Sequence, residues 1–323
     1  MKPFFKWSGG KRKETPVVDE FKPKQFNTYY EPFVGGGAAW LHLEHPKSVI
    51  NDSYKEMINF YRVLASDTQR LVDTINELSK NYSIEVSGIV KDELLEKKVT
   101  QLKLEVDLLK SSENVDKYIL LFPMAKAQLR AAKKELNKDF YTLADKYYYY
   151  YRDNHFEDKF DEAVKFYMLR QLSFSGMLRF GKEGNFNIPY GWYKSFKGIA
   201  AENVEDIQKV LGNTNILCGD WKDAVKGATK NDFVFLDPPY TRRFSEYHHA
   251  GQFGESEHKE LADWFSTTPA RAMIIINKDE YTEKLYKKYI KQEYDKRYSI
   301  QYRDRMQEKD SNAIHIVATN YSP

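Results

Sequence analysis

The stretch Phe233-Val234-Phe235-Leu236-Asp237-Pro238-Pro239-Tyr240 decides the fold, because it reads as a buried strand followed by a turn. Phe and Val favour extended backbone, and the two prolines cannot donate hydrogen bonds to a sheet. We therefore expect the strand to end at Leu236. The Asp237 carboxylate would then lie at the carboxyl end of the strand, where open α/β sheets bind their ligands. Asp-Pro also marks ordinary surface turns, so the stretch gains meaning from its partners elsewhere in the chain.

The residues after this strand suit a flat substrate that carries an amino group. The Asp237 carboxylate and the Pro238 carbonyl can accept N–H hydrogen bonds, and the Tyr240 ring can stack on the face of the substrate. The turn therefore predicts a site for such a substrate.

A second candidate ligand site lies between Tyr29 and Leu41. A short strand ends near Tyr30, and the turn Gly35-Gly36-Gly37 precedes the small residues that open a helix. This order is typical of nucleotide-type sites, because missing side chains let a ligand approach the backbone. Trp40 stands where a dinucleotide fingerprint needs its third glycine, which counts against NAD or FAD. Asp52, at the end of the next predicted strand, favours ribose hydroxyls, with a helix cap as the alternative.

Two further segments carry candidate ligand residues. The start of the chain, MKPFFKWSGGKRK, is basic and has a Gly9-Gly10 turn. We expect Trp7 to flank a ligand and Lys11 to meet a carboxylate, although a frayed basic terminus would read the same way. Asp220 follows a predicted strand over residues 215–218 and is another candidate for ligand contact.

Composition limits the class of protein. The chain has 323 residues, of which 41% are hydrophobic and 15% aromatic, so it can bury a sizeable core as one α/β domain with an insertion or as two domains. One cysteine excludes an internal disulfide and fits a reducing compartment. No stretch reads as a signal peptide or a membrane span, which predicts a cytoplasmic protein. His248 and His249 lack further ligands at a suitable spacing, so we expect no metal site.

Charge is distributed unevenly along the chain. The net charge of +3 identifies no partner. One region, residues 165–197, combines a single acid, Glu183, with six basic residues that can attract phosphate backbones: Lys165, Arg170, Arg179, Lys182, Lys194 and Lys197.

Two regions in the middle of the chain read as additions to the sheet. Residues 91–136 predict a helical hairpin, because apolar residues recur by four and three from Leu95 to Leu109. Cover for an exposed flank, dimerisation and DNA clamping stay open as its role. Residues 174–194 contain glycines between short aromatic pieces and predict a β-hairpin. Arg179 and Lys182 at its tip are placed to reach bases or phosphates, although charged tips are usually only solvated.

Four blocks together resemble the Dam family (D12 class, alpha group) of DNA adenine-N6 methyltransferases. They are Lys6–Lys11, Glu31–Gly37, Asn51-Asp52 and Asp237–Tyr240, in the order and spacing of that family. Residues 185–194 are also similar to its target-recognition hairpin. The match covers residues 1–65 and 165–323, but not roughly 80–160, where this chain is longer than typical members.

The resemblance implies a fold and a division of the chain. The fold is α/β, a Rossmann-like S-adenosylmethionine-dependent methyltransferase sheet with helices on both faces, plus a helical and β-hairpin insertion that recognises DNA. Residues 1–65 and 200–323 would form the catalytic domain. Residues 66–199 would form the inserted region, with the hairpin at about 174–196.

The resemblance also implies roles for single residues. The catalytic residues would be Asp237, Pro238, Pro239 and Tyr240. S-adenosylmethionine would be held by Trp7, Lys11, Glu31, Pro32, Phe33, Gly35, Gly37, Asp52, Asp220 and Asp237, with Lys11 near its amino-acid end and Asp52 on its ribose. DNA would be contacted by Lys6, Arg179, Lys182, Tyr193 and Lys194.

The implied activity is methylation of adenine N6 in double-stranded DNA after the base leaves the duplex, with GATC as the common family target. We expect a monomer in a prokaryotic cytoplasm or a phage-infected cell, with an associated restriction endonuclease as a further partner. Methylation of RNA or of protein glutamine, and a DNA-binding protein without catalysis, are the alternatives. Glutamine enzymes typically carry Asn at the position of Asp237, and a silent homologue would be expected to have lost chemical residues.

Overall fold

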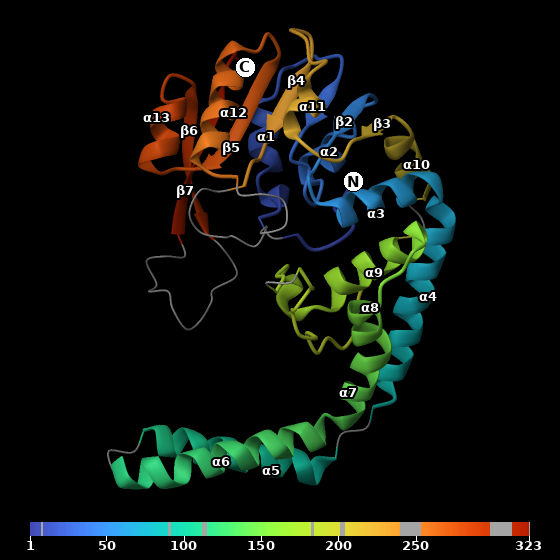
Figure 1. Ribbon diagram of the computed structural model, residues 1–323, viewed down its shortest axis with the longest axis vertical. Helices are drawn as coiled ribbons and strands as arrows, with labels where there is room; N and C mark the ends of the chain where they lie inside the picture. The colour runs from blue at the N-terminus through green and yellow to red at the C-terminus, as the bar shows by residue number, and fades with distance from the viewer. Residues whose placement is uncertain are drawn as a thin grey trace.

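The computed structural model describes residues 1–7, 9–89, 92–111, 115–181, 184–200, 204–239, 253–297 and 312–322. Its centre is a seven-stranded sheet in the order β3-β2-β1-β4-β5-β7-β6 (Figure 1). The strands are β1 (Tyr29–Glu31), β2 (Ser48–Ile50), β3 (Thr214–Ile216), β4 (Phe233–Leu236), β5 (Arg271–Asn277), β6 (Ile290–Arg297) and β7 (Asn312–Thr319). Strands β1 to β5 run parallel, and β7 pairs antiparallel with both β5 and β6. The predicted Rossmann-like α/β sheet is confirmed.

The central strands are apolar because both of their faces are covered. Side chains alternate between the faces, so Phe233 and Phe235 of β4 join one apolar cluster while Val234 and Leu236 join the other. On the first face lie α1 (Thr15–Phe21), α2 (Ala38–Leu43), α3 (Lys55–Ser66) and α10 (Val204–Gly212). On the second face lie α11 (Trp221–Val225), α12 (Glu255–Thr267) and α13 (Glu280–Tyr286).

The order of the strands reverses between β1 and β4. From β1 the chain passes outward to β2 and β3, whereas β4 leads to β5 on the opposite side. Such a switch point leaves a crevice beyond the carboxyl ends of the two strands, which is where open α/β sheets bind ligands. Glu31 ends β1 and Asp237 follows β4, so two of the predicted site residues lie at the switch point.

A helical region connects α3 to the second half of the sheet. It comprises α4 (Thr68–Ser87), α7 (Lys138–Ala144), a π-helical turn (Asp145–Tyr149), α8 (Tyr150–Asp153) and α9 (Lys159–Leu172). In Figure 1, α4 runs away from the sheet and α7 to α9 return beside it. The rings of Phe60 on α3 and Tyr167 on α9 stack at 5.7 Å, so the sheet's apolar cluster continues into this region.

Between α4 and α7 an arm projects from the molecule (Figure 1). We call α5 (Glu93–Lys110) and α6 (Val115–Leu136) the arm. Their facing sides share a small apolar cluster of their own, with Val106 and Leu109 packed on Ala125 and Leu129. This confirms the helical hairpin predicted for residues 91–136.

The segment after α9 follows the path of a hairpin without forming regular strands. After a 3₁₀ turn at Phe174–Gly176, the described residues make only the isolated bridges Ser173–Tyr190 and Phe180–Phe186. The predicted β-hairpin is therefore correct in its course and wrong in its secondary structure. We call residues 174–181 and 184–196 the recognition segment, after the hairpin that the family resemblance implies.

Tyrosines from the helical region hold the recognition segment in place. The Tyr148 hydroxyl donates to the Ile188 carbonyl at 2.7 Å, and the Tyr82 hydroxyl donates to the Tyr193 carbonyl. Tyr147 and Tyr148 are buried, so these two members of the tyrosine run at 147–151 have a packing role. No helix in the described part of the chain is long and apolar enough to cross a membrane.

Candidate active site at the strand ends

Asp237 forms an ion pair with Lys11 just beyond β4. One carboxylate oxygen, Oδ1, lies 2.6 Å from the Lys11 Nζ. The Lys11 side chain is only 4% exposed, because the 3₁₀ turn Lys11–Lys13 packs it under the strand ends. Burial raises the pKa of the Asp237 carboxyl, and the Lys11 ammonium opposes that rise. The pair therefore favours an ionised acceptor inside a partly desolvated site. The carboxylate that Lys11 contacts in this structure belongs to the protein, and its predicted contact with a ligand stays a prediction.

A buried acid, Glu14, lies close to Lys11 and contacts strands β6 and β7. The Glu14 carboxylate accepts hydrogen bonds from the Tyr294 hydroxyl at 2.6 Å and from His315 Nδ1 at 3.0 Å. Its second oxygen lies 2.8 Å from the Lys296 Nζ. Burial alone would raise the pKa of Glu14, but His315, Lys11, Lys296 and Tyr294 together hold it at about 2. These contacts fix the start of α1, and with it Lys11, against β6 and β7.

The glycine turn after β1 is tied to Asp52 and Asn51. Asp52 accepts the backbone N–H of Gly35 on Oδ2 and that of Tyr54 on Oδ1, both at 3.0 Å. The Asn51 amide donates to the carbonyls of Pro32 at 3.1 Å and Gly219 at 3.0 Å. Asn51 thus joins the ends of β1, β2 and β3. Burial raises the pKa of Asp52, and the backbone N–H groups counteract the rise.

Trp7 lies directly on the glycine turn. A Cβ added at Gly35 would come within 2.5 Å of Trp7 Nε1, and one at Gly36 within 2.7 Å of Trp7 Cβ. Gly35 and Gly37 also have φ of +46° and +69°, the left-handed region that favours glycine. The missing side chains therefore let the indole approach the backbone. The structure brings together Trp7, Gly35, Gly37 and Asp52, four of the residues predicted to hold a ligand, along one wall.

Glu31 is a buried carboxyl beside this wall. It is 3% exposed and accepts a hydrogen bond from the Tyr29 hydroxyl at 2.7 Å. Burial is the main cause that raises the pKa of Glu31 to about 8, with the nearby Asp237 charge adding to it. A pKa raised this far favours the protonated form of Glu31 at neutral pH.

The other residues that were predicted to contact a ligand lie at the edge of the site. Phe33 packs its ring 5.4 Å from that of Phe253, edge to face. The Asp220 carboxylate caps α11 by accepting the Lys222 N–H at 2.9 Å, and it lies 3.3 Å from the Lys222 Nζ. Asp220 is thus engaged with its own helix in this structure. Pro238 and Pro239 follow Asp237 in the turn, and Tyr240 lies outside the described residues.

The DNA-binding candidates lie on and beside the recognition segment. The Lys6 Nζ stands 4.2 Å above the Tyr193 ring, and burial followed by the Arg170 charge lowers the pKa of Lys6. Arg179 Nε donates to the Asn187 Oδ1 at 2.8 Å, which holds the exposed guanidinium across the segment. Lys194 is exposed, and Lys182 lies outside the described residues.

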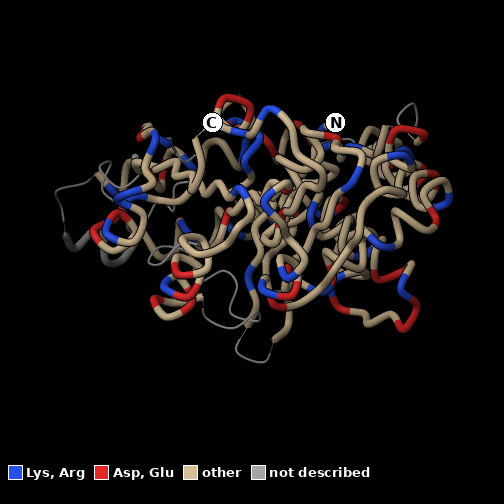
Figure 2. Tube along the Cα trace, turned by 90° about the horizontal axis from the view of Figure 1, so that it is seen from above, with Lys and Arg blue, Asp and Glu red and all other residues tan. Residues whose placement is uncertain are grey.

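One basic residue of the charged stretch cannot reach a phosphate. Arg170 is 1% exposed, donates to the Lys6 carbonyl at 2.9 Å and lies over the Trp7 ring. Its inclusion among the phosphate-attracting residues was wrong. Its role is to hold the Lys6-Trp7 segment between α9 and the glycine turn. Figure 2 shows basic and acidic residues interspersed along most of the chain.

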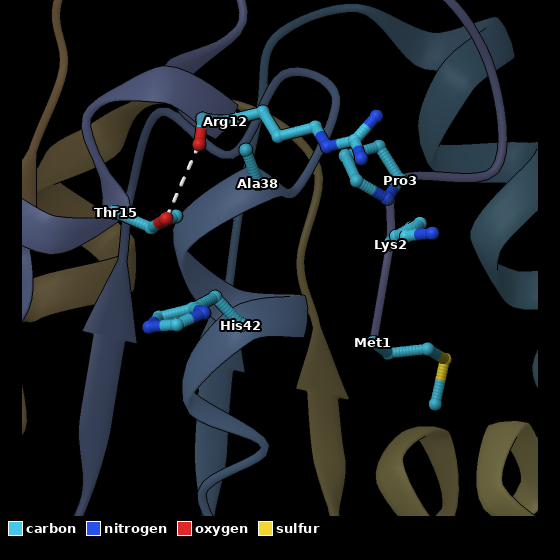
Figure 3. Close-up of a pocket in the computed structure, with 7 residues that line it drawn as sticks. All are labelled: Met1, Lys2, Pro3, Arg12, Thr15, Ala38 and His42. Carbon is cyan, nitrogen blue, oxygen red and sulfur yellow. Dashed lines mark hydrogen bonds between the residues drawn. The ribbon is translucent and has the colours of Figure 1, made fainter.

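A small pocket of about 160 Å³ lies beneath the N-terminal segment (Figure 3). It is lined by Met1, Lys2, Pro3, Arg12, Thr15, Ala38 and His42. None of these is a predicted site residue, and the volume is below the roughly 300 Å³ at which cofactor pockets begin. Among the residues that the structure describes, no group of three metal-ligating side chains is placed to hold a metal ion.

Several residues of the site had no predicted role. Asn51 was visible beside Asp52, yet only the folded sheet shows that its amide bridges three strand ends. Glu14 and its partners come from opposite ends of the chain, so no local pattern joins them. The sequence shows only that Glu14 stands three residues after Lys11, and their burial is seen only in the folded chain.

Comparison of the sequence with known proteins shows which family the chain resembles. The family model described as D12 class N6 adenine-specific DNA methyltransferase matches residues 7–135 and 87–306. The chain is 29% identical to the type II methyltransferase M.CviBI of Paramecium bursaria Chlorella virus NC1A, over 99% of this chain and 100% of the relative. It is 29% identical to M1.LlaDCHI of Lactococcus lactis subsp. cremoris, over 90% and 86%.

A further relative is the DNA adenine methylase of Haemophilus influenzae, 22% identical over 88% of this chain and 82% of the relative. Because the family model spans most of the chain, including both strand-end motifs, the chain belongs to the D12 class of N6 adenine-specific DNA methyltransferases.

Proposed function

We propose that the protein transfers a methyl group from S-adenosylmethionine to adenine N6 at a specific site in double-stranded DNA. The observation that carries the proposal is the Lys11–Asp237 pair at the switch point, beside the Trp7-covered glycine turn. A carboxylate paired with an ammonium and a nucleotide-type cradle thus lie at neighbouring strand ends.

The residues of the cradle fit S-adenosylmethionine, which supplies an electrophilic methyl group on a sulfonium centre. Asp52 uses each carboxylate oxygen for one backbone N–H, and each oxygen retains acceptor capacity for a ribose hydroxyl. Glu31 supplies a carboxyl that can ionise opposite a cationic ligand. Trp7 and Phe33 offer flat apolar surfaces, Pro32 shapes the turn, and Asp220 stands at the rim.

Asp237 and the Pro238 carbonyl would accept the two N6 protons of an adenine that has left the duplex. The N6 lone pair is delocalised into the ring, so the free amino group is a poor nucleophile. Two acceptors favour a more pyramidal nitrogen whose lone pair points at the methyl group. As the methyl carbon bonds to N6, its bond to the sulfonium sulfur would break and leave a neutral thioether. One N6 proton would be released, and the Asp237 carboxylate is an acceptor in place for it. Pro239 stiffens the turn, and Tyr240 would stack on the base.

The recognition segment would read the target sequence. Arg179 is held in a fixed orientation and has the donor geometry that pairs with a guanine edge. Lys194 and Lys182 would contact phosphates, and Lys6 with Tyr193 would contact DNA beside them. GATC is the first sequence to test. The relatives' names cover both type II methyltransferases and DNA adenine methylases, so a companion restriction endonuclease belongs to this proposal as a partner to look for.

A methylation assay tests the proposal. The protein would be incubated with labelled S-adenosylmethionine in three separate reactions. One would contain duplex DNA that includes all short sequences, one single-stranded RNA, and one a mixture of proteins. We expect label only in the DNA, as N6-methyladenine at one short sequence. Label in RNA or protein alone, or N4-methylcytosine as the product, would contradict the substrate assignment.

A further inference from the structure

The arm has one basic flank that the catalytic site does not use. In an α-helix, positions three, four and seven apart lie on one side. Lys126, Arg130, Lys133 and Lys134 of α6 follow this spacing, while Ala125 and Leu129 pack against α5. All four basic side chains are exposed. The basic flank, as we call these four residues, is therefore separate from the apolar seam that holds the arm together.

The residues that the structure describes do not neutralise the basic flank. Within the described part of the chain none of its four residues takes part in an ion pair, whereas Lys110 on α5 lies 3.6 Å from the Asp107 carboxylate. Lys126 lies over the Phe122 ring at 5.5 Å, a contact that leaves its charge in place. Between Leu121 and Leu136 the only acid is Glu135. Unpaired like charges along one flank repel one another, so their retention needs a polyanionic partner or solvent.

The arm is long enough to follow about one turn of a duplex. The 22 residues of α6 span about 33 Å, close to one helical turn of B-DNA. In Figure 1 the arm bends at its base and runs beneath the recognition segment, instead of continuing outward along α4. Its internal apolar cluster makes it a stiff projection and not an extended loop.

We propose that the basic flank of the arm docks on the phosphate backbone of duplex DNA outside the methylated site. The inference rests on the proposed function, since it takes double-stranded DNA as the substrate. Contacts to phosphates add affinity and fix the register of the protein without reading sequence. The arm thus enlarges the footprint on DNA while target choice stays with the recognition segment.

The test compares two variants with the same change in charge. In the arm variant, Lys126, Arg130, Lys133 and Lys134 are all replaced by Gln. In the control variant, four exposed lysines at α13 and the start of β6 are replaced by Gln, namely Lys284, Lys287, Lys288 and Lys291. Affinity is measured for the same target site in a duplex of about one helical turn and in one of about three turns.

We expect the wild-type protein to bind the long duplex at least about ten-fold more tightly than the short one, and the arm variant to lose that gain. The salt dependence of binding to the long duplex should fall by about 0.9 for each phosphate contact that is lost. The control variant should keep the gain. The kcat for methylation at saturating long duplex should be unchanged in the arm variant.

Two results would overturn the proposal. Equal losses in both variants would show a response to total charge and not to the arm. An unchanged preference for the long duplex in the arm variant would show that the basic flank does not contact DNA. In that case, a sedimentation coefficient that differs between the arm variant and the wild type would indicate that the arm mediates self-association. Absence of any DNA methylation by the wild-type protein would instead contradict the proposed function, so the two failures are distinguishable.

Discussion

At the scale of single residues, the Lys11–Asp237 pair would set the pH range in which the proposed site accepts the N6 protons. Burial alone would favour a protonated Asp237, and a protonated carboxyl donates a hydrogen bond where an acceptor is needed. The ammonium 2.6 Å away opposes this effect. Lys11 is therefore as much a part of the chemistry as the carboxylate that it contacts.

Replacing Lys11 by Met should move the acid limb of the pH–kcat profile upward by about 1–3 pH units, because Asp237 loses the nearby cation. The profile would be measured by methyl transfer between about pH 5 and pH 9, since its limbs report the pKa values of the essential groups. Lys13→Met on the same turn is the control, because Lys13 is exposed. An acid limb that stays in place in Lys11→Met would remove Lys11 from this role.

Glu31 makes a second residue-scale prediction. Its pKa of about 8 means that the free protein holds a proton there at neutral pH. A cationic methyl donor beside it would lower that pKa, so binding should release a proton and become tighter as the pH rises toward 8. Calorimetric titration of S-adenosylmethionine in two buffers of different ionisation enthalpy counts the protons. We expect release in the wild type and none in Glu31→Gln; equal proton counts would mean that Glu31 does not face the donor.

At the scale of elements, the buried Glu14 links the start of α1 to β6 and β7 through His315, Tyr294 and Lys296. Its pKa in the folded protein is about 2, against 4.5 for an ordinary glutamate. A depressed pKa of this size contributes about 3 kcal/mol to the free energy of unfolding. The contribution is present above pH 4.5 and is lost as the pH falls toward 2.

Glu14→Gln should therefore be destabilised at about pH 7, and its deficit against the wild type should shrink at about pH 3. Urea unfolding at the two pH values measures both differences. Glu20→Gln on the exposed side of α1 serves as the control. A deficit of the same size at both pH values would show that packing, and not the charge of Glu14, holds these elements together.

Local patterns predicted the strand ends better than the contacts between them. The prolines after Leu236 and the glycines after Glu31 fix where β4 and β1 end, because each residue type restricts or frees its own backbone. Strand β6, Ile290–Arg297, is polar along most of its length, so no apolar run marks it in the sequence, yet it is the outermost strand beside β7. The pairing of Lys11 with Asp237 and the burial of Arg170 depend on segments far apart in sequence, so only the folded chain shows them.

At the scale of the whole molecule, three parts are joined by continuous packing. The sheet supplies the strand ends, α9 carries its apolar cluster outward, and tyrosines of α4 and the π-helical turn hold the recognition segment. The arm has a cluster of its own and stands apart from them (Figure 1). Under the proposed function, changes at the strand ends should therefore alter methyl transfer without loss of the fold. Changes on the arm should alter only the affinity for DNA.

The role of Asp237 in methyl transfer is tested by mass spectrometry of nucleosides from target DNA treated with the wild-type protein, Asp237→Ala and Asp237→Asn. We expect N6-methyladenine from the wild type, no detectable product from Asp237→Ala, and a smaller loss in Asp237→Asn, because an amide oxygen still accepts a hydrogen bond. Circular dichroism and binding of S-adenosylmethionine would confirm that both variants are folded. Wild-type amounts of N6-methyladenine from folded Asp237→Ala would contradict this role.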